Sequence, residues 1–185
     1  MNGSWPIKIH SGVNVLSLES KRVVKPFLND DYFKAVIDSV PLVSIDLVVR
    51  NSQGDVLLGQ RLNKPAQGYW FVPGGRIRKN ESLDLAFKRL TLNELRIELD
   101  IQSASYLGLY EHFYCDSIYT DESGDESVST HYLVNGFEIV LPTEKISLPT
   151  VQHDAYKWFT QDELMASNCV HVHTKWYFDK DKGFL

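Results

Sequence analysis

The sequence predicts an α+β sandwich made of several strands and three helices. Three observations support this fold class. Helical or helix-capping patterns occur over residues 30–40, 80–97 and 160–168, β-rich runs separate them, and Gly-containing turns join the runs. A chain of 185 residues suits one domain and is long enough to bury a core.

Composition excludes several functional classes. The chain is 43% hydrophobic and 23% charged, with a formal net charge of −5. This mild acidity, without a basic stripe, argues against binding to nucleic acid or to an anionic membrane. Cys115 and Cys169 do not make a disulfide framework and favour a reduced, cytoplasmic setting. We see neither a run of about 20 apolar residues nor a signal-peptide pattern, so we expect a cytoplasmic protein.

The N-terminal part divides into an extension and a helix. Residues 1–29 form an extension of unknown role, which either packs on the domain or a dimer partner or is a disordered leader. Residues 30–185 are predicted to form the domain. Its first helix covers 30–40, where apolar residues share one side, and Pro41 ends it.

The sheet is predicted from short runs of strand-like residues. Residues 42–50 are rich in β-branched side chains, and the turn 51–54 leads into a second strand over 56–61. Further strands are expected over 99–101, 104–110 and 131–139. The acidic, Gly- and Ser-rich segment 115–129 is predicted to be a mobile loop, either a lid over the site or a surface variation.

Residues 65–97 organise the rest of the chain. They are predicted to form a loop, a short strand, a turn at Gly74-Gly75 and an amphipathic helix. Asn80 is the expected N-cap of this helix. Its buried face is expected to carry Leu83, Phe87, Leu90 and Ile97.

Glu94 falls on the same face of this helix, at helical spacing from Leu83. A buried carboxylate is costly unless a cation meets it. Three interpretations are open: Glu94 pairs with Arg76, Arg89 or another cation, it lies at the edge of the apolar stripe, or it binds a metal ion together with a carbonyl of the Gly-Gly turn.

The spacing of Gly75, Glu81, Arg89 and Glu94 resembles the Nudix box, G-x5-E-x7-R-E-U-x-E-E-x-G-U. The resemblance implies a Nudix-type α/β/α sandwich with a mixed sheet and a loop-helix-loop box. Four positions depart from the pattern: Leu90, Thr91, Asn93 and Arg96. Because a typical Nudix hydrolase uses the missing glutamates to hold metal ions and activate water at phosphorus, this chain is poorly equipped for that reaction.

The GDP-mannose mannosyl hydrolase branch of the family departs in nearly the same way. The segments PLVSIDLVV, RLNKPAQGYWFVPGGR, LTLNEL, THYLVNGF and QHDAYKW are similar to it in order and spacing, over about residues 30–178. The resemblance implies Mg²⁺-dependent hydrolysis of GDP-mannose, or of GDP-glucose, to GDP and free sugar by attack of water at the anomeric carbon with inversion. It further implies a homodimer, a nucleotide-sugar ligand and a role in nucleotide-sugar pools for cell-surface polysaccharide synthesis.

The same resemblance assigns the site residues. It implies that Gly74, Glu94 and Gln152 hold Mg²⁺, with Mn²⁺ as a substitute. His153 matches the catalytic base, and an imidazole with a near-neutral pKa suits that task. Arg61 and Arg76 flank the Gly-rich turn and suit bidentate phosphate binding. The remaining matched positions, near the sugar and the leaving phosphate, are Asp46, His112 and Tyr132. Arg89 is interpreted as a structural partner of Glu81.

The sequence also leaves two other functions and one other metal site open. A Nudix pyrophosphohydrolase would attack phosphorus in another nucleotide sugar, and a non-catalytic nucleotide-sugar-binding domain would keep the cavity without turnover. Cys169, His171 and His173 occur at every second position, and side chains that alternate in this way along a strand can bind Zn²⁺. No fourth ligand is evident.

Overall fold

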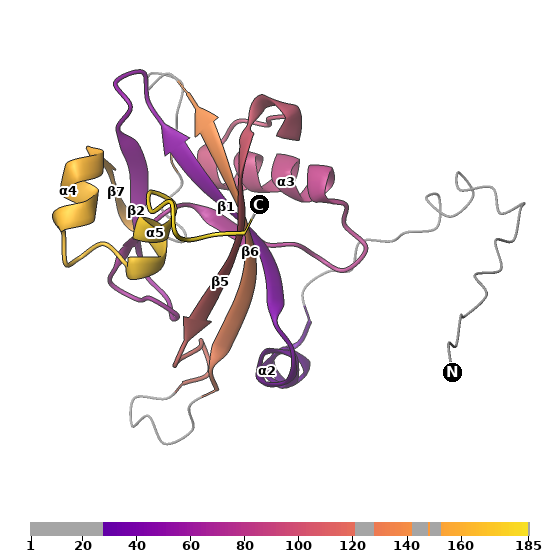
Figure 1. Ribbon diagram of the computed structural model, residues 1–185. Coiled ribbons are helices and arrows are strands. Elements are labelled where there is room, and N and C mark those ends of the chain that lie inside the picture. Colours follow the sequence, from indigo (N-terminus) through magenta and orange to yellow (C-terminus); the bar gives the residue numbers. More distant parts are fainter. Residues whose placement is uncertain (1–27, 121–127, 142–147, 149–152, 185) are drawn as a thin grey trace, which may run out of the picture.

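The protein is described by a computed structural model, which covers residues 28–120, 128–141, 148 and 153–184 (Figure 1). One seven-stranded sheet runs in the order β3-β2-β1-β6-β5, with β4 paired to β1 and β7 paired to β2. The strands are β1 (Leu42–Arg50), β2 (Val56–Arg61), β3 (Trp70–Phe71), β4 (Gly74–Arg76), β5 (Ser105–Tyr114), β6 (Thr130–Val140) and β7 (His153–Phe159). The helices are α2 (Asp30–Ser39), α3 (Leu83–Leu95), α4 (Gln161–Ala166), α5 (Val172–Trp176) and the 3₁₀ turn η1 (Ile101–Ser103).

Strand β1, which the β-branched run predicts as a strand, lies at the centre of the sheet. It pairs in parallel with β6, from Leu42 opposite Tyr132 to Arg50 opposite Val140, and antiparallel with β2 and β4. The sheet is therefore mixed. Because successive side chains of a strand point to opposite faces, Ile45, Leu47 and Val49 face one layer, whereas Asp46 and Val48 face the other.

Two hydrophobic cores, one on each face of the sheet, make the molecule a sandwich. On one face, Ile45, Leu47 and Val49 pack against Phe87 and Leu90 of α3. On the other face, Val48 packs in a cluster with Leu164 of α4 and Tyr177, which follows α5. Figure 1 shows α3 and the α4–α5 pair on opposite sides of the strands. The predicted α+β class and α/β/α sandwich are confirmed.

Helix α3 begins later than the sequence suggested. Its N-cap is Ser82, whose hydroxyl accepts a hydrogen bond from the Leu85 N–H at 3.3 Å, and not Asn80. Asn80 instead adopts a left-handed conformation (φ 69°) in the loop, which asparagine tolerates better than most residues. Leu83 is the first helical residue and is 40% exposed, so the expected buried face begins only at Ala86 and Phe87.

Residues 99–101 do not form the predicted strand. The Leu99 N–H donates to the Thr91 hydroxyl at 3.1 Å, so a side chain of α3 satisfies the backbone where a neighbouring strand would be needed. The turn η1 follows, and β5 then extends four residues beyond the predicted end at Tyr110, to Tyr114. The expected strands over 42–50, 56–61 and 131–139 and the expected helices over 30–40 and 160–168 are confirmed, with shifts of a few residues at their ends.

Several expectations fall wholly or partly outside the described residues. They concern the extension 1–29, of which 1–27 lie outside, the loop 115–129, of which 121–127 lie outside, and Gln152. Within the described ranges, no helix has the length and apolar character needed to cross a membrane.

Candidate functional site

A cavity of about 660 Å³ lies where β1, β4, α3 and the β5–β6 pair meet, and α2 borders it. It is lined by seven of the nine residues expected in the site: Asp46, Arg61, Gly74, Arg76, Glu94, His112 and Tyr132. These residues come from six elements that are far apart along the chain. The fold therefore brings together residues that the sequence linked in part by spacing and in part through the family resemblance.

The two glycines of the box are required for space rather than for an unusual backbone conformation. Gly74 and Gly75 belong to β4, and neither has a positive φ. A Cβ on Gly74 would lie 2.5 Å from the Ile45 carbonyl oxygen and 2.7 Å from Oδ1 of Asp46. A Cβ on Gly75 would lie 2.8 Å from a Leu90 methyl group. Glycine thus lets β4 fit between β1 and α3, which corrects the expectation of a turn.

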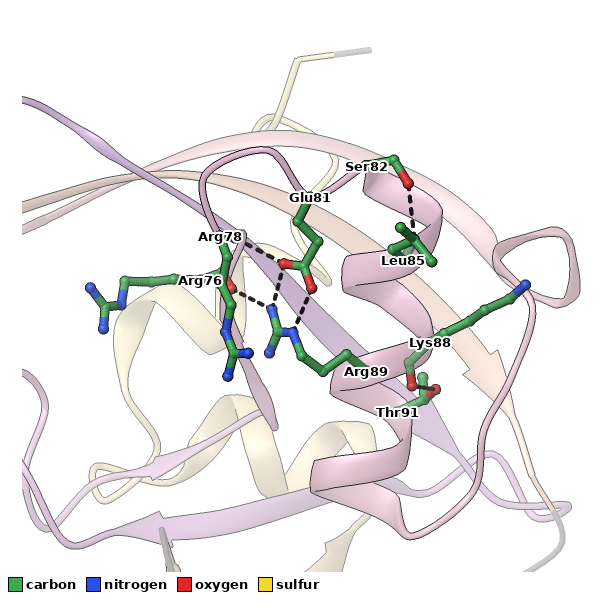
Figure 2. A network of polar contacts seen from close by, with 8 residues as sticks. All are labelled: Arg76, Arg78, Glu81, Ser82, Leu85, Lys88, Arg89 and Thr91. Atoms are coloured by element: carbon green, nitrogen blue, oxygen red, sulfur yellow. Dashed lines mark hydrogen bonds and ion pairs between the residues drawn. The ribbon is translucent and has the colours of Figure 1, made fainter. Parts of the chain in front are cut away.

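A network around Glu81 holds the loop that connects β4 to α3 (Figure 2). The Arg89 guanidinium donates to both carboxylate oxygens of Glu81, at 2.6 and 2.8 Å, and to the Arg76 carbonyl at 2.9 Å. The Arg78 N–H also donates to Glu81, at 2.9 Å. Because Glu81 and Arg89 are occupied with each other, the structural interpretation of this pair is confirmed.

Glu94 lies on the buried side of α3, where it is 2% exposed. Burial raises the pKa of Glu94 from 4.5 to about 7, and the positive charge of Arg61 is the largest effect opposing that shift. Of the box positions that depart from the family pattern, Leu90 and Asn93 both line the cavity, and Leu90 also belongs to the hydrophobic core. Glu94 is therefore the one glutamate of the second half of the box that reaches the cavity.

Asp46 supplies a second buried carboxylate, from β1. One of its oxygens accepts a hydrogen bond from the Tyr177 hydroxyl at 2.7 Å. Burial raises the pKa of Asp46 from 3.8 to about 6, whereas the Tyr177 hydrogen bond and the charge of Arg61 lower it. The cavity thus contains two carboxylates whose burial favours their protonated forms unless positive charge is present.

The two arginines are held in place by different contacts. The Arg61 Nε donates to the Pro65 carbonyl at 2.8 Å, and its guanidinium carbon is 5.7 Å from the centre of the Phe71 ring. The guanidinium of Arg76 lies over the ring of Phe33 in α2, with its carbon 3.9 Å from the ring centre. Burial lowers the pKa of Arg76, which indicates that its charge is partly withdrawn from water.

His112 and Tyr132 face the cavity from neighbouring strands, where they are directly opposite each other. His112 is 1% exposed and stacks on His173, with ring centres 4.2 Å apart and planes within 8°. Burial, and secondarily His173, lowers the pKa of His112 to about 2, so its ring is neutral at pH 7. Burial also raises the pKa of Tyr132, which keeps its hydroxyl protonated.

Of the two remaining expected residues, Gln152 lies outside the described residues, and for His153 the backbone alone is described. His153 begins β7 and lies opposite Arg61 in the β2–β7 pairing. Its backbone therefore lies next to a residue that lines the cavity.

The oxygen ligands in the cavity fit a hard divalent cation. Mg²⁺ takes one or two protein carboxylates and completes its shell with carbonyls, waters and substrate phosphates, and the buried Glu94 provides a carboxylate in the cavity that Gly74 also lines. In the parts of the chain that the structure describes, no group of three or more His, Cys, Asp or Glu residues could hold a metal ion by itself.

The alternative of zinc ligands alternating on a strand around residues 169–173 is not supported, because Val172–Trp176 forms helix α5. His171 caps α5, and its ring accepts a hydrogen bond from the His173 N–H at 3.3 Å. Both imidazoles pack in an aromatic cluster with Tyr114 and Trp176. These contacts explain the two histidines as packing partners of Tyr114 and His112, which line the cavity.

Sequence reasoning missed three residues that support the site: Phe33 beneath Arg76, Tyr177 on Asp46 and His173 on His112. The apolar side of α2 predicted that Phe33 is buried but not that it contacts an arginine. Tyr177 and His173 come from a C-terminal segment that no motif linked to β1 or β5.

Comparisons with known proteins agree with the fold and the box. A family model described as NUDIX domain matches residues 40–180. The low-salt glycan biosynthesis protein Agl8 of Haloferax volcanii is 45% identical over 131 residues, which cover 70% of this chain and 78% of that protein.

Solved structures support the same fold. A MutT protein from Methanosarcina mazei Go1 superposes with a TM-score of 0.59 at 18% identity, covering 77% of this chain and 94% of that one. The NUDIX domain of NrtR from Shewanella oneidensis, complexed with ADP ribose, superposes with a TM-score of 0.54 at 17% identity, covering 84% and 99%.

Proposed function

The chain belongs to the Nudix family, and from this membership and its cavity we propose that it hydrolyses GDP-mannose, or the related GDP-glucose, to GDP and the free sugar. Water attacks the anomeric carbon and inverts its configuration. One observation carries the proposal: two arginines and two buried carboxylates share a cavity, while box positions 90 and 93 hold Leu and Asn. The name of the Haloferax relative supports a role linked to glycan synthesis, and we place the reaction in nucleotide-sugar pools for cell-surface polysaccharides.

Arg61 and Arg76 bind the diphosphate of this substrate. A forked guanidinium matches phosphate oxygens, and a chain with a net charge of −5 needs such a local positive site to hold an anion. The Pro65 carbonyl and the Phe33 ring fix the two side chains before the ligand arrives. Preorganised positive charge stabilises the negative charge that grows on the departing GDP.

Glu94, the Gly74 carbonyl and Gln152 are the residues that we propose as ligands of Mg²⁺ or Mn²⁺. When bound, the ion supplies a hard Lewis acid that offsets charge on the diphosphate. With a pKa near 7, Glu94 ionises readily once a cation approaches. In typical relatives, the attack of water at phosphorus uses several metal ions. Without glutamates at positions 90 and 93, this chain has few ligands to hold them.

His153 is the proposed base. Its imidazole takes a proton from water, the water oxygen bonds to the anomeric carbon, and the bond from that carbon to the phosphate oxygen breaks with its electrons leaving on GDP. GDP is a good leaving group and needs no strong acid. Support for this assignment comes from the Gln152-His153 pair and from the backbone position of His153 opposite Arg61.

The test is to follow GDP-mannose with the protein and Mg²⁺ by proton and phosphorus NMR. The proposal expects GDP and β-mannose as the first products. GMP with mannose 1-phosphate would mean attack at phosphorus and a pyrophosphohydrolase. Ligand signals that shift without turnover would indicate a nucleotide-sugar-binding domain.

A further inference from the structure

We propose that Tyr177 is a positioning residue that holds the Asp46 carboxylate toward the sugar of the substrate. The inference rests on the proposed function, because it takes Asp46 as the group that meets the sugar. Tyr177 is separated from Asp46 by 131 positions, yet its hydroxyl donates to Asp46 Oδ2 at 2.7 Å. Both side chains are more than nine-tenths buried, with exposed fractions of 8% and 7%.

The contact leaves one carboxylate oxygen for a ligand. Oδ2 is engaged by Tyr177, and Oδ1 lies on the side of Gly74, 2.7 Å from where a Cβ of residue 74 would stand. Asp46 and Gly74 both line the cavity. The terminal torsion of an aspartate has a broad energy minimum, so a free carboxylate would lose rotational freedom when a ligand binds. A carboxylate already held at one oxygen has lost that freedom before binding, which favours affinity.

The ring of Tyr177 is itself fixed. It packs edge-on against Tyr110, with ring centres 4.6 Å apart, and lies 6.0 Å from the ring of His112. Its Cε1 would be 3.1 Å from a Cβ on Gly136, so glycine at that position of β6 makes room for the ring. These contacts with β5 and β6 hold the Tyr177 ring against the sheet in one orientation.

The C-terminal segment that carries Tyr177 is attached to the sheet at both ends. Before α5, Val170 forms a bridge with Trp70 of β3. After Tyr177, the backbone of Phe184 exchanges two hydrogen bonds of 2.7 Å with Leu109 of β5. Since the segment lies outside the Nudix box, its place in this site follows from the fold alone.

The predicted effect is selective for the sugar. A hydrogen bond to a charged or partly charged group that is lost from a binding site lowers affinity by about tenfold or more. Removing the Tyr177 hydroxyl should therefore weaken the binding of GDP-mannose, whose sugar contacts Asp46 in this proposal. It should leave GDP, which has no sugar at that position, bound as before.

The experiment compares Tyr177→Phe with Tyr110→Phe, a matched control that removes a hydroxyl from the ring packed on Tyr177. The Tyr110 hydroxyl makes only a long 3.5 Å contact with the Leu107 carbonyl. Stopped-flow displacement of a fluorescent GDP analogue, with Mg²⁺ present, measures binding of GDP-mannose and of GDP before turnover matters. We expect Tyr177→Phe to lose about tenfold in affinity for GDP-mannose alone, and Tyr110→Phe to match the wild type with both ligands.

Two further measurements separate positioning from a structural role. In an Asp46→Ala background, Tyr177→Phe should cause no further loss, because its effect passes through Asp46. In the wild-type sequence with 3-fluorotyrosine at position 177, the fluorine NMR signal should move with GDP-mannose and stay in place with GDP. The fluorine measurement decides the matter even if Tyr177→Phe folds poorly.

The inference would be overturned if Tyr177→Phe lost equal affinity for both ligands or lost affinity for neither. A further loss of GDP-mannose affinity in the Asp46→Ala background would also overturn it. A wild type that binds GDP-mannose without hydrolysing it would refute the proposed reaction, whereas the Tyr177 comparison would still decide the inference. A wild type that does not bind GDP-mannose would overturn both.

Discussion

The Arg89 guanidinium donates hydrogen bonds to both carboxylate oxygens of Glu81, at 2.6 and 2.8 Å, and also to the Arg76 carbonyl. One side chain of α3 thus fixes both the loop before the helix and the strand that carries a proposed phosphate-binding arginine. The Glu81 side chain is 4% exposed and that of Arg89 21%, so the pair is largely shielded from water.

The Arg89–Glu81 pair should contribute to stability. Arg89→Lys keeps the charge but cannot form two parallel hydrogen bonds, and we expect the free energy of unfolding to fall by about 1–3 kcal/mol. Denaturant unfolding measures this change. Lys88→Ala is the control, because Lys88 pairs with Asp84 and Asp100 at the surface and should change the free energy of unfolding much less than Arg89→Lys does. Equal losses in the two variants would contradict the role assigned to Arg89.

His112, which lines the cavity, and His171 and His173, which pack behind it, should make the protein sensitive to acid. Burial lowers the pKa of His112, His171 and His173 to about 2, 4 and 3, whereas an unfolded histidine titrates near 6.5. Between these values the unfolded chain binds more protons, so their contribution to stability is present above pH 6.5 and is lost as the pH falls. At pH 5, each histidine that stays neutral in the folded protein should lower the free energy of unfolding by about 2 kcal/mol relative to its value above pH 6.5.

The check is denaturant unfolding from pH 7.5 to pH 5, with His173→Gln beside the wild type. The variant lacks one of the three groups and should lose less stability over this range. A wild-type stability that does not change between these pH values would contradict the neutral, buried state of the cluster.

Glu94 should set the metal requirement. Glu94→Gln removes the charge from the cavity, and we expect the Mg²⁺ concentration that gives half-maximal rate to rise at least about tenfold. The control is Glu98→Gln, an exposed glutamate just beyond the end of α3. Titrating the initial rate with Mg²⁺ distinguishes the variants, and the same metal dependence in both would remove Glu94 from the metal site.

His153→Ala should abolish turnover while preserving binding. Loss of a general base typically costs 10²- to 10⁴-fold in kcat, and we expect an unchanged affinity for GDP. Lys157→Ala, an exposed residue on the same strand, should keep the wild-type rate. Steady-state rates with displacement binding test both expectations. A His153→Ala variant of normal rate would mean that another group accepts the proton.

Much of the fold could be predicted because local patterns and tertiary packing agree there. The β-branched run of β1 is buried on both faces, and Phe87 and Leu90 pack where the helical period places them. The predictions failed where the side chain that satisfies a backbone N–H could not be identified from the sequence. Thr91 satisfies the Leu99 N–H in place of a strand, and Ser82 caps α3 in place of Asn80.

The candidate site was predictable to the extent that its residues lie in the motif segments. Seven of the nine expected residues line one cavity, and the structural role of Arg89 followed from the box spacing. The supporting contacts of Tyr177 and His173 were not predictable. They depend on how the C-terminal segment crosses the sheet, and no spacing along the chain encodes that path.

The most direct test of the central claim is hydrolysis of GDP-mannose in water enriched in oxygen-18, followed by mass spectrometry of the products. Attack at the anomeric carbon places the label in mannose and leaves GDP unlabelled, which is the result that the lost glutamates of the box lead us to expect. Label in a phosphate group of GMP or of mannose 1-phosphate would contradict the account, because water would then have attacked phosphorus.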